Sequence, residues 1–157
     1  MTKPEFLRWL QETPVARSIS KSNHLVGAGL QVAHIFGFLM LLTAVLFVSL
    51  RLLGLVLPEQ PVSLVWREAR KFVWAGFGLA VVSGILMFLT TPQRYLGNAA
   101  FLLKMALLVV AVLLQSLLFR RVAEDDSAAL LPARAGAMLT LAVWLAIAGA
   151  GRFIGFL

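Results

Sequence analysis

Four long apolar stretches dominate this sequence and constrain what it can fold into. They run roughly from residue 25 to 50, 72 to 89, 99 to 119 and 135 to 157. A helix needs about 20 mostly apolar residues to cross the hydrocarbon core of a bilayer. The sequence therefore predicts an all-α fold, a transmembrane four-helix bundle. The stretches occupy most of the 157 residues, so we expect no soluble enzyme domain.

The composition supports a membrane protein and argues against a nucleic-acid partner. Hydrophobic residues make up 61% of the chain and charged residues 13%, whereas a soluble domain is about half apolar and a quarter charged. The formal net charge is +7, but the basic residues cluster at the ends of the apolar stretches, where they meet lipid head groups. There is no cysteine, which excludes disulfides and thiolate-held clusters.

The polar N-terminal tail, residues 1–23, precedes a membrane domain that we assign to residues 24–157. Thr2 followed by Glu5 is typical of a helix start. The next residues mix bulky apolar and charged side chains, which favours a short helix lying in the membrane interface. We expect Pro14 to end this helix. A solvated tail without structure is the alternative.

Lysine and arginine are more frequent around the loops that follow the first and third stretches than in the turn after the second. Positive loops tend to stay in the cytoplasm. We therefore expect a multi-pass protein of the bacterial inner membrane, with both termini on the non-cytoplasmic side. The residues that carry this bias are Arg51, Arg67, Arg70, Lys71, Arg120, Arg121 and Arg134.

Small residues recur every four positions on three of the predicted helices. Such stripes allow close helix packing in a membrane, and they equally leave room for a flat cofactor. We expect them to face a neighbouring helix or a cofactor. The stripes are Gly29, Ala33 and Gly37, then Gly76, Ala80 and Gly84, then Ala142, Ala146 and Ala150.

Four ionisable side chains lie within the apolar stretches or at their ends, and such groups are functional candidates by default. All four lie toward the membrane face that carries the N-terminus, because the first and third stretches begin there and the second and fourth end there. Each also has a structural explanation, since Lys and Arg can reach the head groups and a histidine can be a hydrogen-bonded residue. They are His24, His34, Lys104 and Arg152.

Histidine is a common protein ligand of haem iron, so His34 is the predicted ligand of a b-type haem or another metal. His24 is the candidate for a second, shallower site, because ten helical residues separate the two histidines by about 15 Å. We expect Lys104 and Arg152 to meet haem propionates. Gln31, one turn before His34, is expected to orient the imidazole.

Several short segments match the pattern of a known family: residues 34–37, 50–54, 74–77, 83–88, 98–105 and 151–155, with Tyr95 and Trp144. Together they resemble a family of uncharacterised bacterial four-helix membrane proteins, a domain of unknown function. The third stretch also distantly resembles the copper-resistance D membrane proteins. The resemblance implies a four-helix fold and singles out His34, Lys104 and Arg152. Gln31 stands where the family often has an acidic residue.

These features leave three functions open. The first is a haem b protein that passes electrons, with quinone as a candidate partner. The second is a structural or binding subunit of a larger membrane complex, or of a homodimer. The third is transport of copper or a small solute. Whether the protein is an enzyme stays undecided, although no motif typical of a hydrolase occurs.

Overall fold

The structure is a computed structural model that describes residues 2–124 and 130–156. In that part of the chain every regular element is a helix, which confirms the all-α prediction. The helices are α1 (Lys3–Gln11), α2 (Pro14–Lys21), α3 (His24–Leu52), α4 (Val62–Thr90), α5 (Pro92–Leu96), α6 (Ala99–Glu124) and α7 (Leu130–Phe153).

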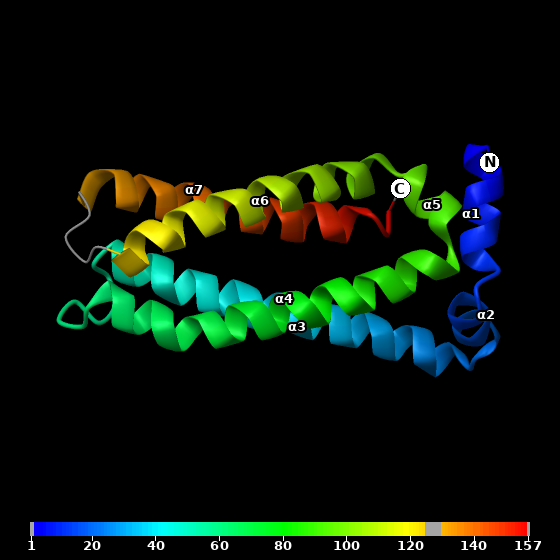
Figure 1. Cartoon of the computed structure of the whole chain (residues 1–157), viewed down its shortest axis with the longest axis horizontal. Helices are drawn as coiled ribbons and strands as arrows, with labels where there is room; N and C mark the ends of the chain where they lie inside the picture. The colour runs from blue at the N-terminus through cyan, green and yellow to red at the C-terminus, as the bar shows by residue number, and fades with distance from the viewer. Residues whose placement is uncertain (1, 125–129, 157) are drawn as a thin grey trace.

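The four long helices α3, α4, α6 and α7 form an antiparallel bundle (Figure 1). Helix α3 packs against α4 and α7, and α6 packs against the same two helices, so the four close a ring. Each is long and apolar enough to cross a membrane, as the sequence predicts. The prediction that the fourth span runs to the chain end is wrong, because α7 ends at Phe153.

The second helix is longer than its apolar stretch, since it begins at Val62 rather than near residue 72. In this added segment Val65 and Ala69 are buried, whereas Arg67 and Arg70 are exposed. One side of the segment therefore continues the core while the other keeps its charges in water or head groups. A sequence window that counts only apolar residues misses such a two-sided extension.

The core runs through the middle of the bundle and toward the end opposite the termini. Its largest members include Leu41 and Val45 on α3 and Trp144 and Ile147 on α7. The Trp144 ring lies 6.0 Å from that of Phe38, centroid to centroid. Burial of these side chains fixes the long helices against one another.

Glycines bring α3 and α4 into backbone contact. A Cβ added to Gly37 would lie 2.8 Å from the Ala80 amide nitrogen, and one added to Gly76 would lie 2.5 Å from the Gly37 carbonyl oxygen. These distances are too short for any side chain, so the stripe prediction holds for this contact. Ser83 and Gly84, one turn further along α4, lie against His34.

At other positions the stripes face no helix of this chain. An added Cβ at Gly29 would meet nothing within 4 Å, and Gly29 is exposed. On α7, Ala142 and Ala146 are exposed and only Ala150 is buried. A four-residue repeat drifts around a helix that has 3.6 residues per turn, so one stripe does not stay on one neighbour.

The tail forms two helices where the sequence predicts one. Glu5 accepts a hydrogen bond from the Thr2 amide at 2.7 Å, as expected for a helix start. Pro14 begins α2 rather than only ending α1, because proline suits the first position of a helix. Figure 1 shows α1 lying across the bundle axis at the end of the bundle, the orientation expected of an interfacial helix. Phe6 and Trp9 are exposed on it.

The two ends of the bundle differ. Helices α1, α2 and α5 gather at one end, and the loop between α3 and α4 lies at the other, beside the start of α7 (Figure 1). The turn predicted after the second span is the short helix α5. Of the basic residues used to predict orientation, Arg120 and Arg121 have side chains that lie outside the described part.

Candidate functional site

His34 lies in the α3–α4 interface, on the half of the bundle nearer the termini. Its Nδ1 is 2.8 Å from the Ala80 carbonyl oxygen and 3.3 Å from the Ser83 hydroxyl. A carbonyl oxygen only accepts, so Nδ1 carries the proton and donates it to Ala80. Gly84 leaves room for the ring, because a Cβ there would lie 3.0 Å from the His34 Cε1 atom.

Lys104 reaches the other ring nitrogen from α6. Its Nζ lies 3.2 Å from the His34 Nε2 atom. In the neutral ring with a proton on Nδ1, Nε2 is an acceptor, so the lysine donates to it. The chain of bonds runs from Lys104 through the imidazole to the Ala80 carbonyl, and it links three of the four spanning helices.

The fourth helix completes this centre. A Cβ added to Gly151 on α7 would lie 3.4 Å from the Lys104 Nζ atom. The lysine side chain therefore lies against a position without a side chain. The ion pairs found among the described residues, around Glu12 and Glu68, are exposed and do not include Lys104. Its partner is thus a neutral imidazole rather than a carboxylate.

Arg152 is not part of this centre. It is exposed, and its guanidinium carbon lies 4.5 Å from the centroid of the Phe156 ring. One residue along a helix turns the side chain by about 100°. Since Gly151 faces Lys104, Arg152 points away from it.

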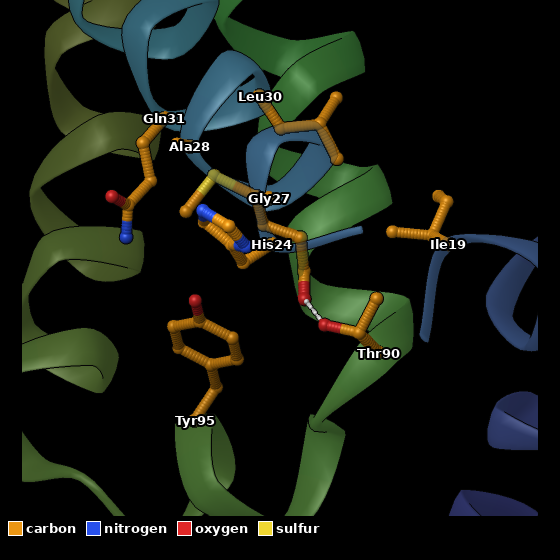
Figure 2. Close-up of a pocket in the computed structure, with 9 residues that line it drawn as sticks. Ile19, His24, Gly27, Ala28, Leu30, Gln31, Thr90 and Tyr95 are labelled. Carbon is orange, nitrogen blue, oxygen red and sulfur yellow. Dashed lines mark hydrogen bonds between the residues drawn. The ribbon is translucent and has the colours of Figure 1, made fainter. Parts of the chain in front are cut away.

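His24 and Gln31 line a separate cavity of about 330 Å³ near the bundle end that carries the termini. The cavity is bounded by α2, α3, α4 and α5. Its lining consists of Ile19, His24, Gly27, Ala28, Leu30, Gln31, Met87, Thr90 and Tyr95. Figure 2 shows the Tyr95 hydroxyl, the Gln31 amide and the His24 ring directed toward one common space.

These three polar groups have no hydrogen-bond partner in the part of the chain that the structure describes. Among the described residues, no side-chain hydrogen bond involves His24, Gln31 or the Tyr95 hydroxyl. The Thr90 hydroxyl differs, since it donates to the Met87 carbonyl at 2.7 Å (Figure 2). The cavity therefore offers three free hydrogen-bonding groups, two from α3 and one from α5.

Tyr95 is held firmly although its hydroxyl is free. Its ring centroid lies 5.2 Å from that of Phe101 and 6.1 Å from that of Phe88. Tyr95 belongs to the family pattern but is not among the site residues that the sequence predicts. The signal was weak, because a tyrosine at the membrane interface is usual and only the fold of α5 aims it at the cavity.

The middle of the bundle also contains a polar pair. The Trp144 indole donates to the Gln115 side-chain oxygen at 2.9 Å, and both side chains are buried. This pair joins α6 to α7 and is surrounded by core residues, so we assign it a structural role. Within the described residues, no group of three or more His, Cys, Asp or Glu is placed to hold a metal.

Comparison with known proteins identifies one family. A profile described as a family of unknown function, DUF6644, matches residues 6–157. No curated protein matches the chain. No solved structure matches it.

Proposed function

Since the chain belongs to the family of unknown function DUF6644, we propose a function from its own geometry. The protein is a membrane-embedded binding protein that holds a small, lipid-soluble ligand. The ligand occupies the cavity between α2, α3, α4 and α5. This corresponds to a binding subunit rather than to an electron carrier or a transporter.

The observation that carries this proposal is the set of free polar groups in a cavity. Small-molecule sites are typically cavities of roughly 300–1,000 Å³ with a few convergent polar groups, and this one is about 330 Å³. His24 and Gln31 are exposed and Tyr95 is partly exposed, so the polar groups of all three are accessible to a ligand. Each of the three would gain a hydrogen-bond partner when a ligand with complementary groups binds.

The location supports a ligand that comes from the bilayer. The cavity lies at the bundle end that carries the interfacial helices, and His24, Gly27 and Ala28 on its rim are exposed. We place this end on the non-cytoplasmic side of the bacterial inner membrane, following the distribution of basic residues.

Two glycines on α3 give a direct test. A Cβ at Gly27 or at Gly29 would meet nothing within 4 Å, so both positions accept a side chain, but only Gly27 lines the cavity. We expect the purified protein to carry a small molecule that mass spectrometry detects after solvent extraction. Gly27→Leu should lose it and Gly29→Leu should retain it. A parent protein without such a molecule, or equal retention by both variants, would refute the proposal.

Haem b bound through His34 is a second candidate. One observation favours it: a metal-ligating histidine usually donates its other N–H to a carbonyl or carboxylate, as the His34 Nδ1 does to Ala80. One observation opposes it, because Lys104 engages the Nε2 atom that iron would need. The residues therefore fit haem only if Lys104 moves away. A bound haem would supply one-electron chemistry.

The other expectations stay predictions. No contact among the described residues specifically favours transport of copper or of a small solute. None specifically favours a homodimer or a larger complex.

A further inference from the structure

We propose that the cavity ligand is a quinone, bound through the carbonyl oxygens of its ring. This inference rests on the proposed binding function and names the class of ligand. It concerns binding alone and includes no transfer of electrons.

The polar groups that line the cavity can act as hydrogen-bond donors. The Tyr95 hydroxyl, the Gln31 amide and a ring N–H of His24 can each donate a hydrogen bond. They come from α5 and α3 and converge on one space (Figure 2). A ligand that satisfies them must present acceptors on more than one side, as the carbonyl oxygens on opposite sides of a quinone ring do.

The described lining of the cavity lacks the strongly charged residue types. The described residues of the lining include no Lys, Arg, Asp or Glu. A phosphate or carboxylate head group taken into this space would have neither a lysine nor an arginine of the described lining to pair with, and burying an unpaired charge is costly. The cavity therefore favours a neutral ligand over a phospholipid head group or a fatty acid.

Part of the cavity wall is apolar. Ile19, Leu30 and Met87 line the same cavity. An apolar ring gains by leaving water beside them, and the methionine sulfur adds a favourable contact with a π-system. The exposed rim at Gly27 and Ala28 leaves a path for an isoprenoid tail to remain in lipid.

The Tyr95 hydroxyl is preorganised for binding a ligand. The stacked rings of Phe88 and Phe101 hold the Tyr95 ring, so its hydroxyl is already aimed before a ligand arrives. A donor that is fixed in advance loses little entropy on binding. Tyr95 should therefore contribute most clearly to affinity.

The test is equilibrium binding of radiolabelled decyl-benzoquinone to the protein in phosphatidylcholine nanodiscs, with empty nanodiscs to subtract partitioning into lipid. We expect saturable binding that decylbenzene, which has the same tail and no oxygens, does not displace. Tyr95→Phe and Gln31→Leu should each weaken binding about 3- to 10-fold, the range expected for one lost hydrogen bond. Gln93→Leu, at the same end of the bundle but outside the cavity, should bind like the parent.

The outcomes separate the two proposals. No saturable quinone binding, displacement by decylbenzene, or unchanged affinity in both Tyr95→Phe and Gln31→Leu would overturn the quinone assignment. If the parent still carries a small molecule that Gly27→Leu loses, the binding function stands and its ligand belongs to another class. If decyl phosphate binds more tightly than the quinone, the neutral-ligand argument is wrong.

Discussion

At the scale of single residues, His34 illustrates how a membrane interior changes the meaning of a polar side chain. In water, an imidazole that forms hydrogen bonds with two groups of the protein contributes little to the stability of the fold. Inside a bilayer it can satisfy a backbone carbonyl on α4 and an amine on α6 at once. Hydrogen bonds between membrane helices contribute about 0.6 kcal/mol each on average, so the centre joins helices without dominating their stability.

The haem candidate makes a sharp prediction at this scale. Protein produced with haem supplied should show a Soret band, and His34→Ala should lose it because the ligand is gone. Lys104→Met should increase the fraction of protein with haem, because the Nε2 atom loses its competing partner. Absorption spectra of the oxidised and reduced proteins provide the measurement. A colourless parent would end the haem candidate, and a band that survives in His34→Ala would move the ligand elsewhere.

At the scale of elements, the bundle depends on one close helix pair. Helices α3 and α4 touch through backbone at Gly37 and Gly76, and this contact brings Ala80, Ser83 and Gly84 against His34. Close approach of backbones is a main source of association between helices in lipid, where apolar side chains gain little by leaving the bilayer. The pair therefore sets the geometry of the polar centre as well as the packing.

Gly37→Ala tests this pair. The added methyl group would lie 2.8 Å from the Ala80 amide nitrogen, so the helices must move apart. Overpacking of this kind costs about 1–3 kcal/mol, and we expect a lower Tm in detergent. The matched control is Gly78→Ala on α4, where a Cβ meets nothing within 4 Å and the Tm should not fall. Equal Tm values for Gly37→Ala and the parent would show that α3 and α4 are not in close backbone contact at this position.

At the scale of the whole molecule, the two ends of the bundle have different characters. One end carries the short helices α1, α2 and α5, whereas the other carries the loop between α3 and α4 (Figure 1). The cavity with its free polar groups lies at the end with the short helices. The cavity lies near one end only, whereas the structural pair of Gln115 and Trp144 lies near the middle of the bundle.

The four-span arrangement and its orientation predict which introduced cysteines a reagent labels from outside the cell. The chain has no cysteine of its own, so each variant carries a single reactive thiol. Glu59 and Arg94 are both exposed, in the loop after α3 and in α5 respectively. In intact cells, a membrane-impermeant maleimide should label Arg94→Cys and should label Glu59→Cys only after the membrane is opened. Labelling of both from one side would refute the four-span arrangement. The reverse pattern would keep the fold and invert its orientation.

The sequence by itself determined the number of helices that are long and apolar enough to span a membrane, and the position of the ionisable groups along them. Length and apolar content decide whether a segment crosses a bilayer, and both are local properties. The depth of His34 and Lys104 follows from counting residues along a helix, so their placement on one half of the bundle needed no tertiary information.

Only the tertiary structure decided which of these groups meet. Helix rotation and the order of helices around the bundle set that outcome, and neither is encoded in one short segment. Thus Gly151 faces Lys104 while Arg152, one residue later, points away. Tyr95 joins His24 and Gln31 for the same reason, because packing against Phe88 and Phe101 aims a ring that its own sequence neighbourhood leaves free to turn.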